Sequence, residues 1–336
     1  MLCAFKFVSC ILLFVFFTTS CSGSAIGFND DPGLQESDYN LNWMESIPDD
    51  TPLSAISIPG THESLTLYGG PLIRCQAWTL DKQLKVGLRY FDVHAGNWFV
   101  GQKSVDIVSD SRWMFRQYIT FEEVLEIILD FLKVHDSETV LLRVKLHGLY
   151  QKKIAKMIIK LITNIKKRVW TEFSVPKLKK VRGKIVFIQS DAFNYGTLNH
   201  DTFFPDDDRF RNIEKKIKKV KKYLKVAEEN CAHHIVLTDT TATSFLNNPK
   251  KVALGVNKQL NDLVVEHKQN SVIPGCLGVI TMNFPSSDLI KKIIQIKPCI
   301  CSNNTVASPK TTLDSTPEAP STPYQTSDQG PETTAE

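Results

Sequence analysis

The chain has 336 residues, of which 42% are hydrophobic and 10% aromatic, and its formal net charge is +4. This composition can bury a substantial core, so it excludes a chain that is disordered throughout and predicts one large domain or two ordinary ones. The modest charge and the lack of a recognisable nucleic-acid-binding module exclude nucleic acid as the expected partner.

The first 25 residues have the pattern of a secretory signal peptide. Lys6 gives a basic start, the segment CILLFVFF (residues 10–17) is a short apolar core, and Gly23 and Ala25 are the small residues expected before a cleavage site. The alternative is an uncleaved membrane anchor, which needs ~20 apolar residues, more than this segment offers. We therefore expect a secreted, extracellular protein in which residues 26–44 lead into the folded part.

The carboxyl-terminal segment, residues 302–336, is rich in Ser, Thr and Pro and is predicted to be a disordered tail. Asn303 begins an Asn-Asn-Thr sequence, which is an acceptor for N-glycosylation. Five cysteines follow the leader, and they allow two disulfides and one spare thiol, although their spacing does not give the pairing. These cysteines are Cys75, Cys231, Cys276, Cys299 and Cys301.

Residues 50–298 alternate short β-rich runs with longer helical ones. The predicted strands are residues 53–59, 88–94, 105–109, 139–146, 184–189, 234–238 and 277–284. Thr120 and Glu123 form a capping-box pattern before one helix. Two lysine-rich segments, residues 152–168 and 213–225, have helical spacing, and their lysines either face water or attract anionic lipid headgroups or acidic glycans. Repeated strand–helix–strand units favour a parallel sheet, and the number of strands favours one closed barrel over two open sheets.

In such a barrel, active sites lie on the loops that follow the carboxyl ends of the strands. The polar residues at the predicted strand ends are His62, Glu63, Asp92, His94, Ser109, Asp110, Lys145, His147, Gln189, Ser190, Asp239 and Asn283. The period of two along a strand puts Asp92 and His94 on one side, and likewise Lys145 and His147. Imidazoles, carboxylates and a lysine at one mouth suit phosphodiester chemistry, which needs a base, an acid and cations for the phosphoryl charge.

Two segments then resemble a known family. The sequence SIPGTHES (residues 57–64), followed by RCQAWTLDKQLKVGLRYFDVHAG (residues 74–96), is similar to the X region of phosphatidylinositol-specific phospholipases C, particularly the compact secreted bacterial type. The resemblance covers roughly residues 45–297. It implies an α/β fold, a distorted or incomplete TIM-type (βα) barrel, formed as a single domain by residues 45–298.

The resemblance also implies roles for single residues. His62 matches the general base that deprotonates the inositol 2-hydroxyl, which attacks the phosphorus, releases diacylglycerol and forms a cyclic inositol phosphate. Glu63 stands where aspartate is usual, and Lys145 matches a substrate-contacting lysine. Gln189 falls where an arginine is expected, and Asp92 is the acid of a Phe-Asp segment that contacts substrate.

Three catalytic positions depart from the family pattern. His94 replaces the arginine that stabilises phosphate, Asn283 replaces the aspartate that orients the base, and residues 105–113 lack the histidine that protonates the leaving group. His147 lies on the inward face and is a candidate replacement for this acid. Losing a general acid typically costs ~10²–10⁴ in rate, so weak or lost activity is expected.

Three hypotheses stay open. The first is a phosphodiesterase acting on inositol phospholipids or glycolipids at a membrane surface without a cofactor, with His62, His94 and His147 as catalytic residues. The second is a secreted pseudoenzyme that binds phosphoinositol headgroups, glycolipid or a protein partner. The third is a metal-assisted phosphodiesterase that holds a divalent cation with His62, Glu63, Asp92 and His94. A monomer is expected in each case.

Overall fold

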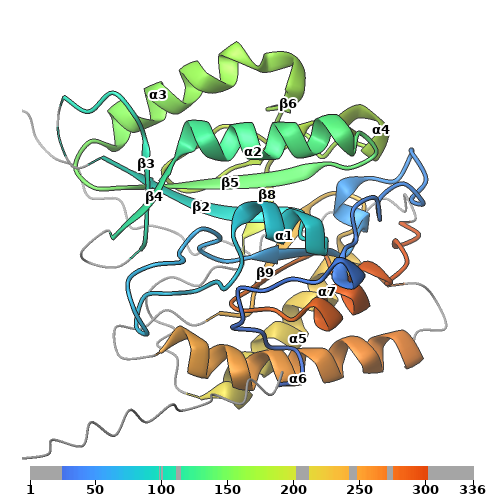
Figure 1. Ribbon diagram of the computed structural model, residues 1–336. Coiled ribbons are helices and arrows are strands. Elements are labelled where there is room, and N and C mark those ends of the chain that lie inside the picture. The colour runs from blue at the N-terminus through green and yellow to red at the C-terminus, as the bar shows by residue number, and fades with distance from the viewer. Residues whose placement is uncertain are drawn as a thin grey trace, which may run out of the picture. The chain divides into compact units, whose positions relative to one another are not determined.

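A computed structural model of the chain describes residues 25–97, 99, 101–110, 115–201, 212–241, 248–270 and 275–301 (Figure 1). Residues 1–24 of the predicted signal peptide, Asn303 and the predicted tail lie outside the described residues. Among the helices that are described, none is both long enough and apolar enough for a membrane span.

The strands are β1 (Ile58–Thr61), β2 (Tyr90–Gly96), β3 (Asp106–Val108), β4 (Arg116–Thr120), β5 (Val140–His147), β6 (Val169–Trp170), β7 (Ile185–Ile188), β8 (Asn199–Asp201), β9 (Ile235–Asp239) and β10 (Val279–Met282). The helices are α1 (Leu80–Val86), α2 (Phe121–Val134), α3 (Gln151–Asn164), α4 (Leu178–Val181), α5 (Ile213–Glu229), α6 (Pro249–Asn270) and α7 (Ser287–Ile294). The 3-10 turns are η1 (Glu36–Asp38), η2 (Leu53–Ala55) and η3 (Lys166–Arg168).

The sheet is a curled parallel sheet that nearly closes on itself. Its strands follow the order β6-β7-β5-β2-β1-β10-β9-β8, and each neighbouring pair is parallel. Thr197 makes a parallel bridge to Ile188 of β7, and two residues later the same segment pairs with β9 as β8. Figure 1 shows α2 and α3 on one side of the curled sheet and α5 and α6 on the other. The distorted or incomplete TIM-type barrel expected from the sequence is confirmed.

Two of the predicted strands are wrong in part. Residues 53–55 form the turn η2, so β1 begins only at Ile58. Residues 106–108 do form a strand, β3, but it pairs antiparallel with the end of β2 and with β4 instead of joining the barrel. A parallel crossover needs a dozen or more residues, and the connection 97–105 is too short for one. β4, β6 and β8 were not predicted.

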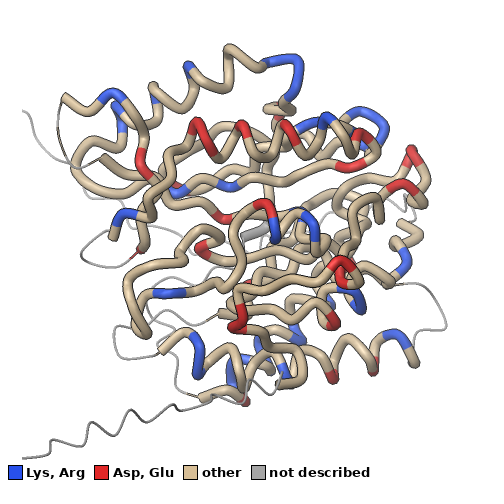
Figure 2. Tube along the Cα trace, in the orientation of Figure 1, with Lys and Arg blue, Asp and Glu red and all other residues tan. Residues whose placement is uncertain are grey.

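The predicted helices form where expected. Thr120 and Glu123 make the reciprocal capping box at the start of α2. The lysine-rich segments form α3 and α5. Figure 2 shows basic residues along α3 and acidic residues along the neighbouring α2, so the two helices differ in charge.

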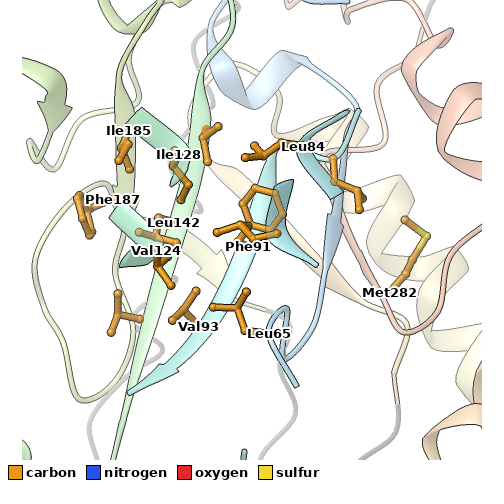
Figure 3. Packing of buried hydrophobic residues seen from close by; sticks show 14 of the residues in the cluster. Leu65, Leu84, Phe91, Val93, Val124, Ile128, Leu142, Ile185, Phe187 and Met282 are labelled. Carbon is orange, nitrogen blue, oxygen red and sulfur yellow. The ribbon is translucent and has the colours of Figure 1, made fainter. Parts of the chain in front are cut away.

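The strands alternate between two apolar layers. Side chains that point into the barrel fill the half where the parallel strands begin, which we call the lower half; the end where the strands finish is the upper end. The inward-pointing residues of the lower half are Ile58, Tyr90, Leu141, Val186, Leu237 and Val279. The intervening residues, such as Phe91, Val93 and Leu142, point outward and pack against Leu84 of α1 and Val124 of α2 (Figure 3). Because both faces of the parallel strands are covered, the polar residues of the sheet have to gather at its upper end.

A buried ion pair fixes the lower end of β2. Arg89 is fully buried, and its Nε donates to Glu138 Oε2 at 2.8 Å. The other guanidinium nitrogens donate to the carbonyls of Leu84 and Leu41. Glu138 also accepts the backbone N–H of Met44 at 2.9 Å. This pair therefore ties α1 and the segment before the barrel to β2 and β5.

Two disulfides lie at the lower end of the barrel, opposite to the strand ends that carry the predicted site. They join Cys231 to Cys301 and Cys276 to Cys299, and Cys75 is a buried free thiol, as the odd number of cysteines predicted. Both bridges lie against η2, where the N–H of Cys299 donates to the Ala55 carbonyl at 2.9 Å.

Replacing Glu138 by alanine is expected to destabilise the protein by about 3–5 kcal/mol, because the Arg89 guanidinium would stay buried without its carboxylate. Reversible denaturant unfolding measures this change. The exposed Lys225–Glu229 pair is the control, and Glu229→Ala should change stability little. Equal effects of the two substitutions would contradict the structural role of Arg89.

Removing the Cys231–Cys301 bridge as a Cys231→Ala/Cys301→Ala pair is expected to cost roughly 2–4 kcal/mol, because the bridge closes a loop of 70 residues. Cys75→Ala is the control, since it removes a sulfur atom and no cross-link. An unchanged unfolding midpoint in the double variant would show that the bridge does not restrain the folded barrel.

Candidate active site

The turn after β1 holds His62 in one backbone geometry. The N–H of His62 donates to the Met282 carbonyl of β10 at 3.1 Å, and Gln76 Nε2 donates to the carbonyl of His62 at 2.8 Å. Gly60 lies against β2, because a Cβ atom at this position would be 2.7 Å from Tyr90 Cβ. The side chain of His62 is 2% exposed and follows the inward-facing positions of β1.

Glu63 connects this turn to the hairpin of β3 and β4. Its backbone has φ of 40°, a conformation that residues with a Cβ rarely adopt. Its Oε2 accepts the hydroxyl of Thr66 at 2.8 Å and the N–H of Asp110 at 3.3 Å. Glu63 was predicted to bind substrate, and the structure uses its carboxylate to hold Asp110 near the strand ends.

The upper halves of β2 and β5 present their polar residues to the same face. Their register pairs Asp92 with Arg143, His94 with Lys145 and Gly96 with His147. Period-two alternation therefore gives three inward positions on each strand, as predicted for Asp92 with His94 and for Lys145 with His147.

Asp92 is the centre of this face and is fully buried. Its Oδ2 lies 3.1 Å from His94 Nε2 and 3.8 Å from Lys145 Nζ, and its Oδ1 lies 4.0 Å from Arg143 Nη1. Burial alone would raise the pKa of Asp92, but the charges of Lys145, His94 and Arg143 hold that pKa well below its usual value. The carboxylate is therefore ionised and gathers three basic side chains around it.

The two predicted replacement histidines contact each other. His94 Nδ1 lies 3.1 Å from His147 Nε2, and the rings stack with centroids 4.8 Å apart. Burial lowers the pKa of His94, but Asp92 overcomes this effect and raises it. Burial and the charge on His94 lower the pKa of His147 to about 4. The pKa values of the two contacting histidines are therefore shifted in opposite directions.

His62 faces this pair. The rings of His62 and His94 are 6.1 Å apart and nearly perpendicular. Asp92 and its basic neighbours thus lie to one side of the predicted base, and strands β9 and β10 lie to the other.

On that other side, Asp239 and Asn283 end neighbouring strands. Asp239 accepts Lys216 Nζ at 3.2 Å and the N–H of Thr241 at 2.9 Å. Burial raises the pKa of Asp239, while Lys216 and His62 lower it, with a net downward shift. The Oδ1 of Asn283 is buried and has no hydrogen-bond partner among the described residues. Asp239 is thus a carboxylate close enough to His62 for the charge of His62 to act on it.

Gln189 has a local role at the end of β7. Its Nε2 donates to the Gly196 carbonyl at 3.0 Å, and its own carbonyl accepts Asn199 Nδ2 at 2.9 Å. These contacts hold together the segment that bridges β7 and β9. The structure therefore gives this predicted substrate-binding residue a set of contacts within the barrel wall.

The residues predicted to hold a metal ion fall into different groups. Among the described residues, one compact set of ligand atoms comes from His94, Asp110 and His147, and another from His62, Glu63 and Cys75. Burial, followed by the charges of Glu63 and Asp110, raises the pKa of the Cys75 thiol well above its usual value. Of the four predicted ligands, His62 and Glu63 thus fall in one group and His94 in the other, whereas Asp92 belongs to neither, so the predicted set of four is not brought together as one metal site.

Three residues of this site were not assigned a role from the sequence. Arg143 shares the inward alternation of Lys145 and His147, so the period of two is a signal that could have found it. Asp110 and Asp239 are acidic residues at strand ends, but their proximity to His147 and His62 depends on the folded hairpin and on the order of strands.

The comparisons with known proteins agree with this geometry. Residues 50–190 match the family model described as "Phosphatidylinositol-specific phospholipase C, X domain". The 1-phosphatidylinositol phosphodiesterase of Listeria monocytogenes is 27% identical over 313 residues, which cover 85% of this chain and 94% of that protein.

Solved structures show the same fold. The phosphatidylinositol-specific phospholipase C from Listeria monocytogenes superposes with a TM-score of 0.67 at 26% identity, covering 77% of this chain and 99% of that chain. A mutant of the Staphylococcus aureus enzyme superposes with a TM-score of 0.62 at 17% identity, covering 79% of this chain and 100% of that chain. In sequence and in fold, the chain is therefore similar to phosphatidylinositol-specific phospholipases C, and residues 50–190 correspond to their X domain.

Proposed function

We propose that this protein is a secreted phosphodiesterase that cleaves inositol phospholipids or inositol-containing glycolipids. The observation that carries the proposal is the position of His62, whose ring centroid lies 6.1 Å from that of His94, which in turn contacts the buried carboxylate of Asp92. A phosphoryl group bound at this end of the barrel would have His62 as a base on one side and the basic side chains around Asp92 on the other. The Listeria relative, a 1-phosphatidylinositol phosphodiesterase, supports the substrate class.

His62 acts as the general base in this proposal. It removes the proton of the inositol 2-hydroxyl, whose oxygen attacks the phosphorus and releases diacylglycerol as the cyclic phosphate forms. The imidazolium that results needs a nearby negative charge, and Asp239 supplies it in place of the aspartate that Asn283 replaces. Lys216 keeps Asp239 ionised before the proton arrives.

The basic side chains on β2 and β5 replace the missing phosphate arginine. Lys145 is 24% exposed along its side chain, which allows its ammonium to reach an anionic group while its position near Asp92 is kept. His94, whose pKa Asp92 raises, adds a group that can carry positive charge at the same face. His147 is 18% exposed and His94 is buried, so His147 is the member of the pair that a bound headgroup can reach. In this proposal a proton passes from His94 Nδ1 to His147 Nε2 while the other ring nitrogen of His147 gives its proton to the leaving oxygen.

Exposed apolar side chains around the same end of the barrel support action at a membrane surface. They follow β1, β2 and β5 or belong to the β3–β4 hairpin, and they are Tyr68, Leu72, Phe99, Phe115, Tyr118 and Leu149. We call this set the apolar rim. Tyr118 is 77% exposed, Phe99 75% and Leu149 93%. Amphipathic aromatic rings partition to the interface between lipid and water, so the apolar rim would turn the site toward a bilayer.

Replacing His62 by alanine is expected to lower the rate of phosphatidylinositol cleavage by about 10²–10⁴-fold, because the attacking hydroxyl loses its base. The rate of release of water-soluble inositol phosphate from phosphatidylinositol vesicles measures it. His233→Ala is the control, since that histidine is exposed and lies before β9, at the other end of the barrel. Vesicle binding with equally low turnover in the wild type and in His62→Ala would contradict catalysis and favour a pseudoenzyme.

A Tyr118→Ser/Leu149→Ser variant is expected to bind phosphatidylinositol vesicles several-fold more weakly, because two apolar side chains of the apolar rim no longer enter the lipid. Sedimentation with vesicles measures the bound fraction. Val134→Ser is the matched control, since Val134 is 74% exposed at the far end of α2. Equal losses in both variants would rule out the apolar rim as the lipid-facing surface.

A further inference from the structure

Three side chains from three strand ends meet beside His62. The ligand atoms of His94, Asp110 and His147 all lie within 4.8 Å of one another. We propose that these residues bind a divalent transition metal ion such as Zn²⁺. The site deepens the proposed function and rests on it for any use in catalysis, where the ion would carry the positive charge at the place of the missing arginine and His147 would serve as its ligand instead of as the proton donor.

The spacing of the donor atoms fits such an ion. Zinc–nitrogen bonds of roughly 2.0–2.1 Å at a tetrahedral angle place two imidazole nitrogens about 3.3 Å apart. His94 Nδ1 and His147 Nε2 are 3.1 Å apart, and one ligand atom from each of His94, Asp110 and His147 lies within 4.8 Å of the other two. The two ring nitrogens are therefore already close to the separation that a zinc ion requires.

The surrounding residues prepare two of the three ligands. Asp92 Oδ2 accepts a hydrogen bond from His94 Nε2, which leaves Nδ1 as the nitrogen with a lone pair. A carboxylate on the remote nitrogen of a metal-binding histidine is the usual second-shell arrangement. Glu63 holds the backbone of Asp110 through the Asp110 N–H.

The donor set also selects the kind of ion. Two nitrogen donors and one carboxylate favour zinc and related ions over calcium or magnesium, which prefer oxygen. Asp110 is 41% exposed and His147 18%, so an ion can enter from solvent. Three protein ligands leave a fourth position for water or a phosphoryl oxygen, as in catalytic zinc sites. The other compact group, His62 with Glu63 and Cys75, is wholly buried and lacks such an entry path.

The test is zinc binding by the purified chain with its disulfides intact, after removal of metal with a chelator. Isothermal titration with Zn²⁺ should give one site, and Co²⁺ in its place should give the visible absorption of a tetrahedral ion with nitrogen ligands. His147→Ala is expected to weaken zinc binding by about 100-fold or more. Asp110→Asn and Asp92→Asn should each weaken it by roughly 10–100-fold.

The His233→Ala/His234→Ala variant is the matched control and should bind zinc as the wild type does, because those neighbouring histidines lie at the other end of the barrel. Circular dichroism checks that each variant folds. The proposal is overturned if the wild type binds no zinc, or if His147→Ala binds it equally well. Zinc binding is measured without substrate, so zinc binding without turnover contradicts the proposed function alone, and turnover in a chain that binds no zinc contradicts this site alone.

Discussion

The buried carboxylate of Asp92 is the interaction on which the arrangement of the site depends. A charge removed from water is tolerated in a protein interior only when opposite charges and hydrogen bonds compensate it. Asp92 is fully buried, and His94, Lys145 and Arg143 lie around its two oxygens. The requirement to neutralise one carboxylate therefore gathers three basic groups at one end of the barrel. An anionic ligand at that end meets positive charge that the fold already requires.

The barrel separates this polar end from an apolar one. In the lower half, Tyr90 of β2 and Leu141 of β5 point into the barrel, each two residues before the charged Asp92 and Arg143 of the same strand. They pack with inward-pointing apolar residues of the other strands. The disulfides and the Arg89–Glu138 pair hold that lower end. The disulfides and this buried ion pair thus lie in the half of the barrel that carries no candidate catalytic residue. The upper half can then keep polar groups such as Asn283, whose amide oxygen is buried without a hydrogen-bond partner among the described residues.

Local patterns predicted the parts of the structure that depend on neighbours in sequence. The capping box of α2 and the shared face of Asp92 with His94 follow from periods of a few residues, and both are present. The pairing of β3 with β2 was mispredicted, because an apolar run does not reveal the direction of its partner. The contact of His94 with His147 depends on the register of β2 against β5, and the influence of His62 on Asp239 depends on strand order. Neither the register of two strands nor the order of strands can be predicted from one segment of the sequence.

The close approach of Gly60 to Tyr90 has a consequence for the history of the SIPGTHES turn. The glycine is required where β1 meets β2, and the carbonyl of His62 is held by Gln76 together with β10. Natural selection for folding alone would preserve this glycine and the path of the turn in a descendant that had lost catalysis. His147 is under a different constraint, since it does not contact Asp92 and another side chain could occupy its partly exposed position without disturbing that turn. Divergence among relatives with this fold is therefore expected to change His147 first, and the turn and the charges around Asp92 last.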